Sequence, residues 1–189
     1  MISPDIHFRD RKLVVDGNNL IYHLYYSSNL DQNHGGEYLA FQAEVKAFFK
    51  TLADCGIKPY VVMDGSSSTI DIKLETFKIR AREKVQKTHD AALTGRKGRI
   101  LPTLTKHVFR QTLSDLKVPL VYCFGEADGR LAALAKEWCC PVLSADSDFY
   151  IFDLPGGLLQ LDHFRWRAVE THRGIPCRRY STFQREVLK

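Results

Sequence analysis

Residues 141–148 read Pro-Val-Leu-Ser-Ala-Asp-Ser-Asp, an apolar run that ends in small and acidic residues. A short apolar run of this kind is typical of a buried strand followed by a turn. In extended chain, residues two apart point to the same side, so the side chains of Asp146 and Asp148 can converge on one cation. The segment therefore predicts a strand with a pair of carboxylates at its C-terminal end.

The same arrangement recurs at three other points of the chain. The apolar runs 12–16, 60–64 and 121–125 each end in an acidic residue or lead directly into one. Because the carboxyl ends of parallel strands share one edge of a sheet, we expect these side chains to meet in one crevice. Clustered carboxylates repel one another unless cations lie among them, and hard cations prefer oxygen ligands. The sequence thus predicts a site for Mg²⁺ or Mn²⁺ formed by six acidic residues: Asp16, Asp64, Glu126, Asp128, Asp146 and Asp148.

Each acidic residue alone has a simpler explanation. A single Asp after a strand is more often a helix cap or a turn former than a metal ligand. Glu126 and Asp128 also pose a geometric condition, since residues two apart on a helix lie about 200° apart. They can share a site only if Glu126 is the cap and Asp128 lies in the first turn. The joint placement of the six, rather than any one of them, favours the metal site.

Strand and helix patterns alternate along the chain, which predicts an α/β fold with a mostly parallel sheet. We expect strands at 13–16, 61–63, 119–123 and 142–144, with a short edge strand at 158–161. Helices are expected at 18–26 (capped by Asn18 or Asn19), 41–52, 70–92, 103–117 and 128–138, with a helical turn at 149–152 and a further helix from 182. The domain prediction is one unit over residues 1–189: a core at 11–155, which includes a basic helix and loop at 70–100, and an incomplete C-terminal extension at 156–189.

Composition sets modest limits. The 189 residues are 44% hydrophobic and 26% charged, which fits one domain with a real core. The net charge of +5 is compatible with a polyanionic partner. Five cysteines without C-x-x-C spacing argue against a disulfide framework and a zinc knuckle, and no apolar stretch reaches membrane-spanning length. An intracellular protein without a membrane partner is the default expectation.

The segment between Asp71 and Ile100 is strongly basic, with nine Lys or Arg against four acidic residues. Lys73 and Arg80 lie seven residues apart, on one face of the expected helix. A solvated helix with internal ion pairs is the usual explanation of such a run. Its start a few residues after Asp64 favours an alternative, in which the helix holds a phosphate beside the metal site. The expected nucleic-acid contacts are Arg82, Lys84, Lys87, Arg96, Lys97 and Arg99.

Five segments carry a family resemblance: Leu13-Val-Val-Asp-Gly-Asn-Asn19, Tyr60-Val-Val-Met-Asp-Gly65, Arg80-Ala-Arg-Glu-Lys84, Cys123-Phe-Gly-Glu-Ala-Asp128 and Pro141-Val-Leu-Ser-Ala-Asp-Ser-Asp-Phe149. Together they resemble the asteroid branch of the flap-endonuclease (XPG-type) nucleases, which have a PIN-like α/β core. The resemblance implies a chain truncated at both ends, without the family's N-terminal Met-Gly-Ile-x-Gly-Leu segment and later Gly-x-Asp segment. It also implies roles for eight residues: Asp16, Asp64, Glu126 and Asp128 as ligands of a first metal, Asp146 and Asp148 nearer a second, and Lys73 and Arg80 against the scissile phosphate.

The resulting functional hypothesis is a metal-dependent, structure-selective endonuclease with two bound ions. Its expected substrate is single-stranded or branched DNA with a flap or overhang, in nuclear DNA repair. A base of the single strand could stack on Tyr22, Tyr25 or Phe77, although each of these rings is more commonly a core residue. One alternative is a catalytically impaired PIN-like module that binds nucleic acid or protein. The other, an Asp-x-Asp phosphatase, explains Asp146 and Asp148 but neither the remaining acidic residues nor the basic helix.

Overall fold

The computed structural model describes residues 2–30, 36–65, 70–95, 100–170 and 172–182 of the chain. Its centre is a seven-stranded sheet with the order β1-β7-β6-β5-β2-β3-β4. The five strands from β6 to β4 run parallel, and β7 is antiparallel to both of its neighbours, β6 and β1. The expected α/β fold with a mostly parallel sheet is therefore confirmed. The strands are β1 (Ile2–Phe8), β2 (Lys12–Asp16), β3 (Lys58–Asp64), β4 (Leu120–Cys123), β5 (Val142–Ser144), β6 (Leu158–Gln160) and β7 (Ile175–Tyr180).

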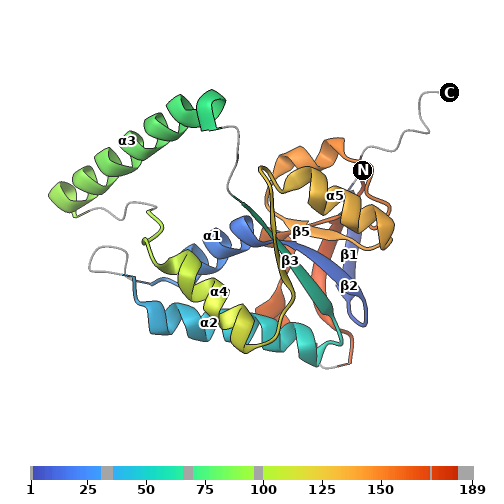
Figure 1. Ribbon diagram of the computed structural model, residues 1–189. Helices are drawn as coiled ribbons and strands as arrows, with labels where there is room; N and C mark the ends of the chain where they lie inside the picture. The colour runs from blue at the N-terminus through green and yellow to red at the C-terminus, as the bar shows by residue number, and fades with distance from the viewer. Residues whose placement is uncertain (1, 31–35, 66–69, 96–99, 171, 183–189) are drawn as a thin grey trace.

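Helices cover both faces of the sheet (Figure 1). The α-helices are α1 (Gly17–Ser27), α2 (Tyr38–Asp54), α3 (Ile70–Thr94), α4 (Thr105–Asp115) and α5 (Asp128–Glu137). Three short 3-10 helices follow: η1 (Ser147–Ile151), η2 (Leu161–His163) and η3 (Trp166–Ala168). α1, α2 and α4 lie on one face and α5 on the other, whereas α3 stands apart from the sheet.

The apolar run of β2 is continuous because both faces of this strand are buried. Leu13 and Val15 belong to the core formed with α1, α2 and α4. Val14, between them, belongs to the second core formed with α5 and Phe149 of η1. The alternation follows from the period of two along a strand. β2 therefore holds the two hydrophobic layers in register and fixes the position of Asp16 at its end.

Several sequence-based expectations need correction. The N-cap of α1 is Asp16 rather than Asn18 or Asn19, because the Asp16 carboxylate accepts a hydrogen bond from the Asn19 backbone N–H. β6 is an inner strand rather than an edge strand, since it pairs with β5 on one side and β7 on the other. Strands β1, β6 and β7 lie outside the expected core of 11–155, yet they belong to the same sheet. The expected helix from residue 182 lies almost wholly outside the described residues.

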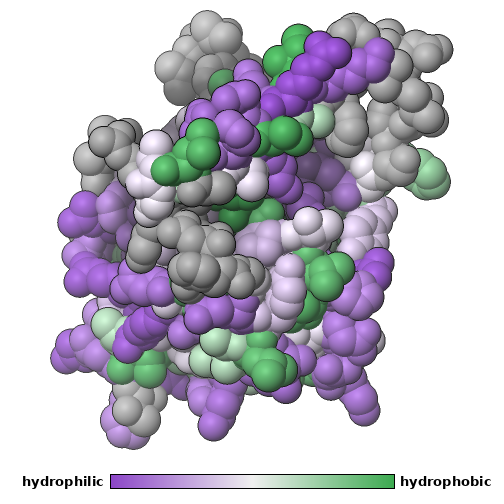
Figure 2. All heavy atoms as spheres, turned by 90° about the vertical axis from the view of Figure 1, so that its left-hand side faces the viewer, coloured by the Kyte–Doolittle hydropathy of each residue, from purple (hydrophilic) through white to green (hydrophobic). Residues whose placement is uncertain are grey.

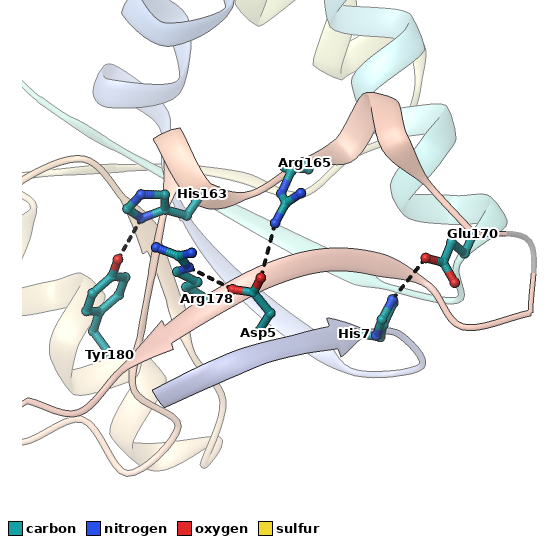
Figure 3. Close-up of polar contacts among 7 residues, drawn as sticks. All are labelled: Asp5, His7, His163, Arg165, Glu170, Arg178 and Tyr180. Carbon is teal, nitrogen blue, oxygen red and sulfur yellow. Dashed lines mark hydrogen bonds and ion pairs between the residues drawn. The ribbon is translucent and has the colours of Figure 1, made fainter. Parts of the chain in front are cut away.

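The antiparallel edge formed by β1 and β7 has no counterpart in the sequence-based expectations. Pro4 argues against a strand, but it falls where the β1–β7 register shifts, at an edge that tolerates proline. Asp5 fastens β1 by accepting hydrogen bonds from Arg178 of β7 (2.7 Å) and from Arg165 (3.2 Å), as Figure 3 shows. Figure 3 also shows His7 beside Glu170, and Tyr180 hydrogen-bonded to His163. Polar contacts of this kind leave no periodic pattern, so the sequence did not reveal this edge.

Two glycines allow the close approach of elements next to the acidic residues. A Cβ atom on Gly17 would lie 2.6 Å from the Met63 side chain, so α1 can begin directly against β3 only with glycine there. A Cβ atom on Gly65 would lie 1.9 Å from the Cys123 carbonyl oxygen. This approach brings the end of β3 against the end of β4. Among the described residues, every helix is too short or too polar to cross a bilayer.

Gly65→Ala tests this packing, and Gly129→Ala is its control. The Cys123 carbonyl is backbone and cannot move aside, so we expect Gly65→Ala to lower the free energy of unfolding by about 3 kcal/mol. A Cβ atom on Gly129, in α5, meets nothing within 4 Å. Gly129→Ala should therefore raise stability by up to ~1 kcal/mol through helix propensity. Urea denaturation measures both. Equal stabilities of the two variants would contradict the proposed steric role of Gly65.

Candidate metal centre

Asp16 is held at the end of β2 by its own hydrogen bonds. Its side chain is 4% exposed. One carboxylate oxygen accepts from the Asn19 backbone N–H at 3.0 Å. The other accepts from Asn19 Nδ2 at 2.6 Å and from Ser144 Oγ at 2.7 Å. Asp16 is thus a helix cap and a buried charge at the same time, and both of its oxygens already have protein donors.

Ser144 joins Asp16 to the acidic residues that follow β5. While its hydroxyl donates to Asp16, its oxygen accepts a hydrogen bond from the Asp146 backbone N–H at 3.0 Å. Asp146 in turn accepts from the Asp148 backbone N–H at 2.9 Å and so caps η1. The ends of β2 and β5 are therefore joined through Ser144. Sequence reasoning missed the roles of Ser144 and Asn19, although both stand inside the quoted acidic segments.

Three carboxylates lie close enough to hold one cation. Asp128, Asp146 and Asp148 each offer an oxygen atom, and these atoms all lie within 4.8 Å of one another. Asp128 comes from the first turn of α5, whereas the other two follow β5. Oxygen ligands at such separations suit a hard divalent cation after small side-chain rotations. The grouping differs from the one implied by the family resemblance, which placed Asp128 with Asp16, Asp64 and Glu126.

Asp64 and Glu126 lie beside this group. Asp64 accepts a hydrogen bond from the Ala127 backbone N–H at 2.8 Å, which ties the end of β3 to the start of α5. The N-cap of α5 is Ala127, so the expectation that Glu126 caps this helix is wrong. Gly125, with a φ of +82°, makes the turn that brings the chain back toward Asp64. The exposed side chain of Glu126 therefore precedes the helix and does not have to lie on one helical face with Asp128.

Electrostatics shows that the acidic residues act on one another. The pKa of Asp128 rises to about 6, first because of burial and then because of the charges of Asp16, Asp146, Asp64 and Glu126. Burial also raises the pKa of Asp16, against the effect of its three hydrogen bonds, and the charge of Asp64 adds to the rise. Asp128 is thus influenced by the charges of four other acidic residues and groups with Asp148 as well. A divalent cation fits this donor set, because its positive charge would offset the repulsion between the carboxylates.

The basic residues of the expected phosphate site are only partly described. Lys73 and Arg80 belong to α3, but their side chains lie outside what the structure describes. Arg82, Lys84 and Lys87 are exposed on the same helix, whereas Arg96, Lys97 and Arg99 fall outside the described residues. Figure 2 views the molecule from the side of α3 and shows a largely hydrophilic surface with scattered hydrophobic side chains.

A pocket of about 320 Å³ adjoins the carboxylates on the side of α1. Its lining includes Asn19, which is hydrogen-bonded to Asp16, and Ala145, which precedes Asp146 in the chain. Tyr22 and Tyr26 line it as well. Tyr22 is 45% exposed, so its ring is accessible. Tyr25, by contrast, is fully buried in the core, so the expectation that a base could stack on Tyr25 is wrong. The side chain of Phe77 lies outside the described residues.

Comparison with known proteins identifies relatives of this chain. The XPG N-terminal domain family matches residues 5–87. The single-strand DNA endonuclease ASTE1 of Danio rerio is 49% identical over 166 residues, which make up 88% of this chain and 24% of that protein. ASTE1 of Homo sapiens is 46% identical over 181 residues (94% and 26%), and protein asteroid of Drosophila melanogaster 41% over 147 (75% and 16%). The chain thus spans about a quarter or less of the length of these relatives.

Solved structures share the fold. The catalytic core of Rad2 in complex with a DNA substrate superposes with a TM-score of 0.57 at 18% identity, covering 94% of this chain and 51% of that one. Human GEN1 in complex with Holliday junction DNA gives a TM-score of 0.53 at 17% identity, covering 92% and 39%. The likeness extends over nearly the whole chain.

The elevated pKa of Asp128 predicts a pH-dependent stability. Because its pKa of about 6 exceeds the ordinary 3.8, ionisation of Asp128 lowers the stability of the folded protein as the pH rises from about 4 to above 6. In EDTA at about pH 8, we expect Asp128→Asn to raise the melting temperature by about 2–4 °C, or ~1 kcal/mol after allowance for solvent screening. The gain should shrink to a small remainder near pH 4, where the folded state binds the proton and the unfolded state is about half protonated.

The control for this measurement is Asp115→Asn, because Asp115 is exposed on α4 and accepts a hydrogen bond from Gln111 on its own helix. It should show no such pH-dependent gain. Mg²⁺ should raise the melting temperature of the original protein more than that of Asp128→Asn, since it binds the folded state. A gain for Asp128→Asn that is equal at both pH values would show that repulsion within the cluster is not its cause.

Proposed function

Because this chain belongs to the asteroid family of proteins with an XPG-type nuclease fold, we propose that it forms the catalytic part of a DNA endonuclease. The proposed reaction is divalent-metal-dependent hydrolysis of phosphodiester bonds in single-stranded or branched DNA. The observation that carries the proposal is the convergence of Asp128, Asp146 and Asp148 within 4.8 Å at the edge of the parallel sheet. The curated relatives named single-strand DNA endonuclease support a single-stranded substrate.

In this proposal Asp128, Asp146 and Asp148 would hold Mg²⁺ or Mn²⁺. Asp64 and Glu126 would lie beside a second ion, and the buried Asp16 would add its negative charge to the site. When bound, such cations supply an acidified water as the nucleophile and offset negative charge on the cleaved phosphate. Ser144 and Asn19 orient Asp16, and Ser144 also holds the Asp146 backbone in place. These residues position the ligands before any cation or substrate arrives.

The basic helix supplies the complement to the acidic edge. We assign to Lys73 and Arg80 the role of orienting the phosphate and offsetting its charge in the transition state. Arg82, Lys84 and Lys87 extend the basic surface along α3 and would bind phosphates farther along the strand. Arg96, Lys97 and Arg99 are proposed contacts of the same kind. A base of a single strand would stack on the exposed ring of Tyr22, beside the carboxylates.

Nuclear localisation and a role in DNA repair are proposals that follow from a DNA substrate. Fluorescence imaging of the tagged protein tests the first. Loss of tolerance to DNA damage in cells that carry an inactive variant tests the second.

Asp146→Ala and Asp148→Ala test catalysis directly. We expect each variant to lose Mg²⁺-dependent cleavage of labelled single-stranded and flap DNA by at least about 10³-fold, because the bound ion acidifies the nucleophile and stabilises the developing charge. Asp115→Ala, on α4, removes an acidic residue outside the cluster and should retain full activity. Circular dichroism verifies that each variant is folded. Unchanged cleavage by both cluster variants would remove the endonuclease proposal.

The double variant Lys84→Gln/Lys87→Gln tests DNA contact by α3. Loss of two phosphate contacts should flatten the salt dependence of single-stranded DNA affinity by about 1.4 in log–log slope, measured in EDTA by fluorescence anisotropy. Lys46→Gln/Lys50→Gln on α2 is the control of equal charge, and its slope should not change. An equal change of slope in both double variants would show that the effect depends on the net charge of the protein and not on contacts made by α3. Salt-sensitive binding without any Mg²⁺-dependent turnover would favour the alternative of a binding module that does not cut.

A further inference from the structure

A second cavity, of about 310 Å³ and partly open to solvent, lies at the opposite edge of the sheet from the carboxylates. It is formed where β2 and β5 begin, at Lys12 and at Pro141, which precedes Val142. Residues of β1 and the Pro155–Gly156 turn before β6 form further walls. Because β2 has five residues of roughly 3.3 Å each, about 15 Å separates this edge from the acidic one. The cavity is therefore distinct from the candidate metal centre.

The charged groups that line this cavity are all basic. They are Arg11, Lys12 and Arg179, and no acidic residue lines the cavity with them. Neither arginine has a carboxylate partner among the described residues. Five other described arginines do form such pairs: Arg9 with Asp10, Arg165 and Arg178 with Asp5, Arg167 with Glu44 and Arg173 with Glu170. The cavity thus gathers cations whose charge this part of the chain leaves uncompensated.

Trp138 holds one of these cations in place. The Lys12 ammonium group lies 4.6 Å from the centre of the Trp138 ring, a cation–π contact. The Tyr60 ring packs against Trp138, with 4.4 Å between ring centres, and so fixes the indole. The Lys12 side chain therefore loses little further freedom when it meets an anion, which favours binding.

The remaining surroundings also suit an anion. Phe8, Leu159 and the two prolines form apolar parts of the wall, which lower the local dielectric constant beside the cations. The C-terminal end of α5 is close by, and its carbonyl groups would repel an anion if they were free. Three of them are hydrogen-bonded, because the backbone N–H groups of Trp138, Cys139 and Cys140 donate to the carbonyls of Leu134, Lys136 and Ala135.

We propose that this cavity binds a phosphate monoester. A monoester carries close to two negative charges and three acceptor oxygens at neutral pH, which match two arginines and a lysine. Arginine binds such groups through two parallel N–H donors. The volume admits a small phosphate ester, or the terminal phosphate of a nucleic-acid strand that enters from outside. The inference is independent of the proposed endonuclease activity, since it uses none of the acidic residues.

Cys139 provides a reporter inside the cavity. It is exposed and lines the wall beside Trp138, whereas Cys123 lies in a different pocket on the far side of α5. Iodoacetamide is uncharged, so its access to Cys139 reports occupancy rather than local potential. Alkylation of each cysteine is measured by peptide mass spectrometry in EDTA, which prevents cleavage. The probes are thymidine monophosphate, a short single-stranded oligonucleotide with a 5′-phosphate, and the same oligonucleotide with a 5′-hydroxyl.

We expect a phosphate-bearing probe to slow alkylation of Cys139 and leave Cys123 unchanged. Arg11→Gln and Arg179→Gln should each raise the half-protecting concentration about tenfold, as expected for the loss of one charged hydrogen bond. Arg173→Gln, which removes an arginine paired with Glu170, is the matched control and should change nothing. Protection by the nucleotide identifies a free phosphate ester as a ligand, and protection by the phosphorylated strand alone identifies a strand end.

Three results would overturn the proposal. One is the absence of protection by every probe. Another is equal protection by the two oligonucleotides, which would indicate backbone contact in place of a terminal phosphate. The third is an equal effect of all three arginine variants. Melting curves show that each variant is folded. Mg²⁺-dependent cleavage should stay unchanged in Arg11→Gln and Arg179→Gln, because neither residue belongs to the candidate metal centre.

Discussion

Ser144 lies between two acidic residues, and its hydroxyl group joins the ends of two neighbouring strands. It donates to the Asp16 carboxylate and accepts from the Asp146 backbone N–H. The β2–β5 ladder joins these strands as far as Val15 and Leu143, and the Ser144 hydroxyl extends the connection to the carboxylates beyond it. The position of Asp148 depends on the same contact, because Asp146 caps η1 and thereby sets the first turn of that helix. The three hydrogen bonds that link Asp16, Ser144, Asp146 and Asp148 form one connected network, which favours a rigid arrangement.

The charges of the molecule are distributed by the direction of its strands. The C-terminal edge of the parallel strands carries carboxylates that raise the pKa of Asp128, and the opposite edge carries the cations of the second cavity. The basic helix α3 stands apart from both edges (Figure 1). A phosphate group is attracted to the helix and the far cavity, while a divalent cation is attracted to the acidic edge. The net charge of +5 is therefore an average over surfaces of opposite sign.

The two sites are held in place by different interactions. At the acidic edge, hydrogen bonds hold like charges together, and the repulsion that remains is released when a cation binds. At the opposite edge, aromatic packing of Trp138 against Tyr60 holds Lys12 above the ring. Both sites are therefore organised before a ligand arrives, which lowers the entropy lost on binding. The antiparallel β1–β7 pair supports the second site only, since Phe8 and Arg179 come from these strands.

The sequence by itself determined the parallel strands and the helices between them, and it predicted that six acidic residues lie at one edge of the sheet. Each of these depends on local apolar periodicity and on the common direction of parallel strands, and both can be read along the chain. Only the tertiary structure decided that Asp128 groups with Asp146 and Asp148, that Ser144 bridges to Asp16, and that β1 and β7 complete the sheet. It also decided that Arg11 and Arg179 share one cavity. Apart from the grouping of Asp128 with Asp146 and Asp148, these contacts join residues more than a hundred positions apart. All of them depend on side-chain and sheet geometry that no periodic pattern along the chain encodes.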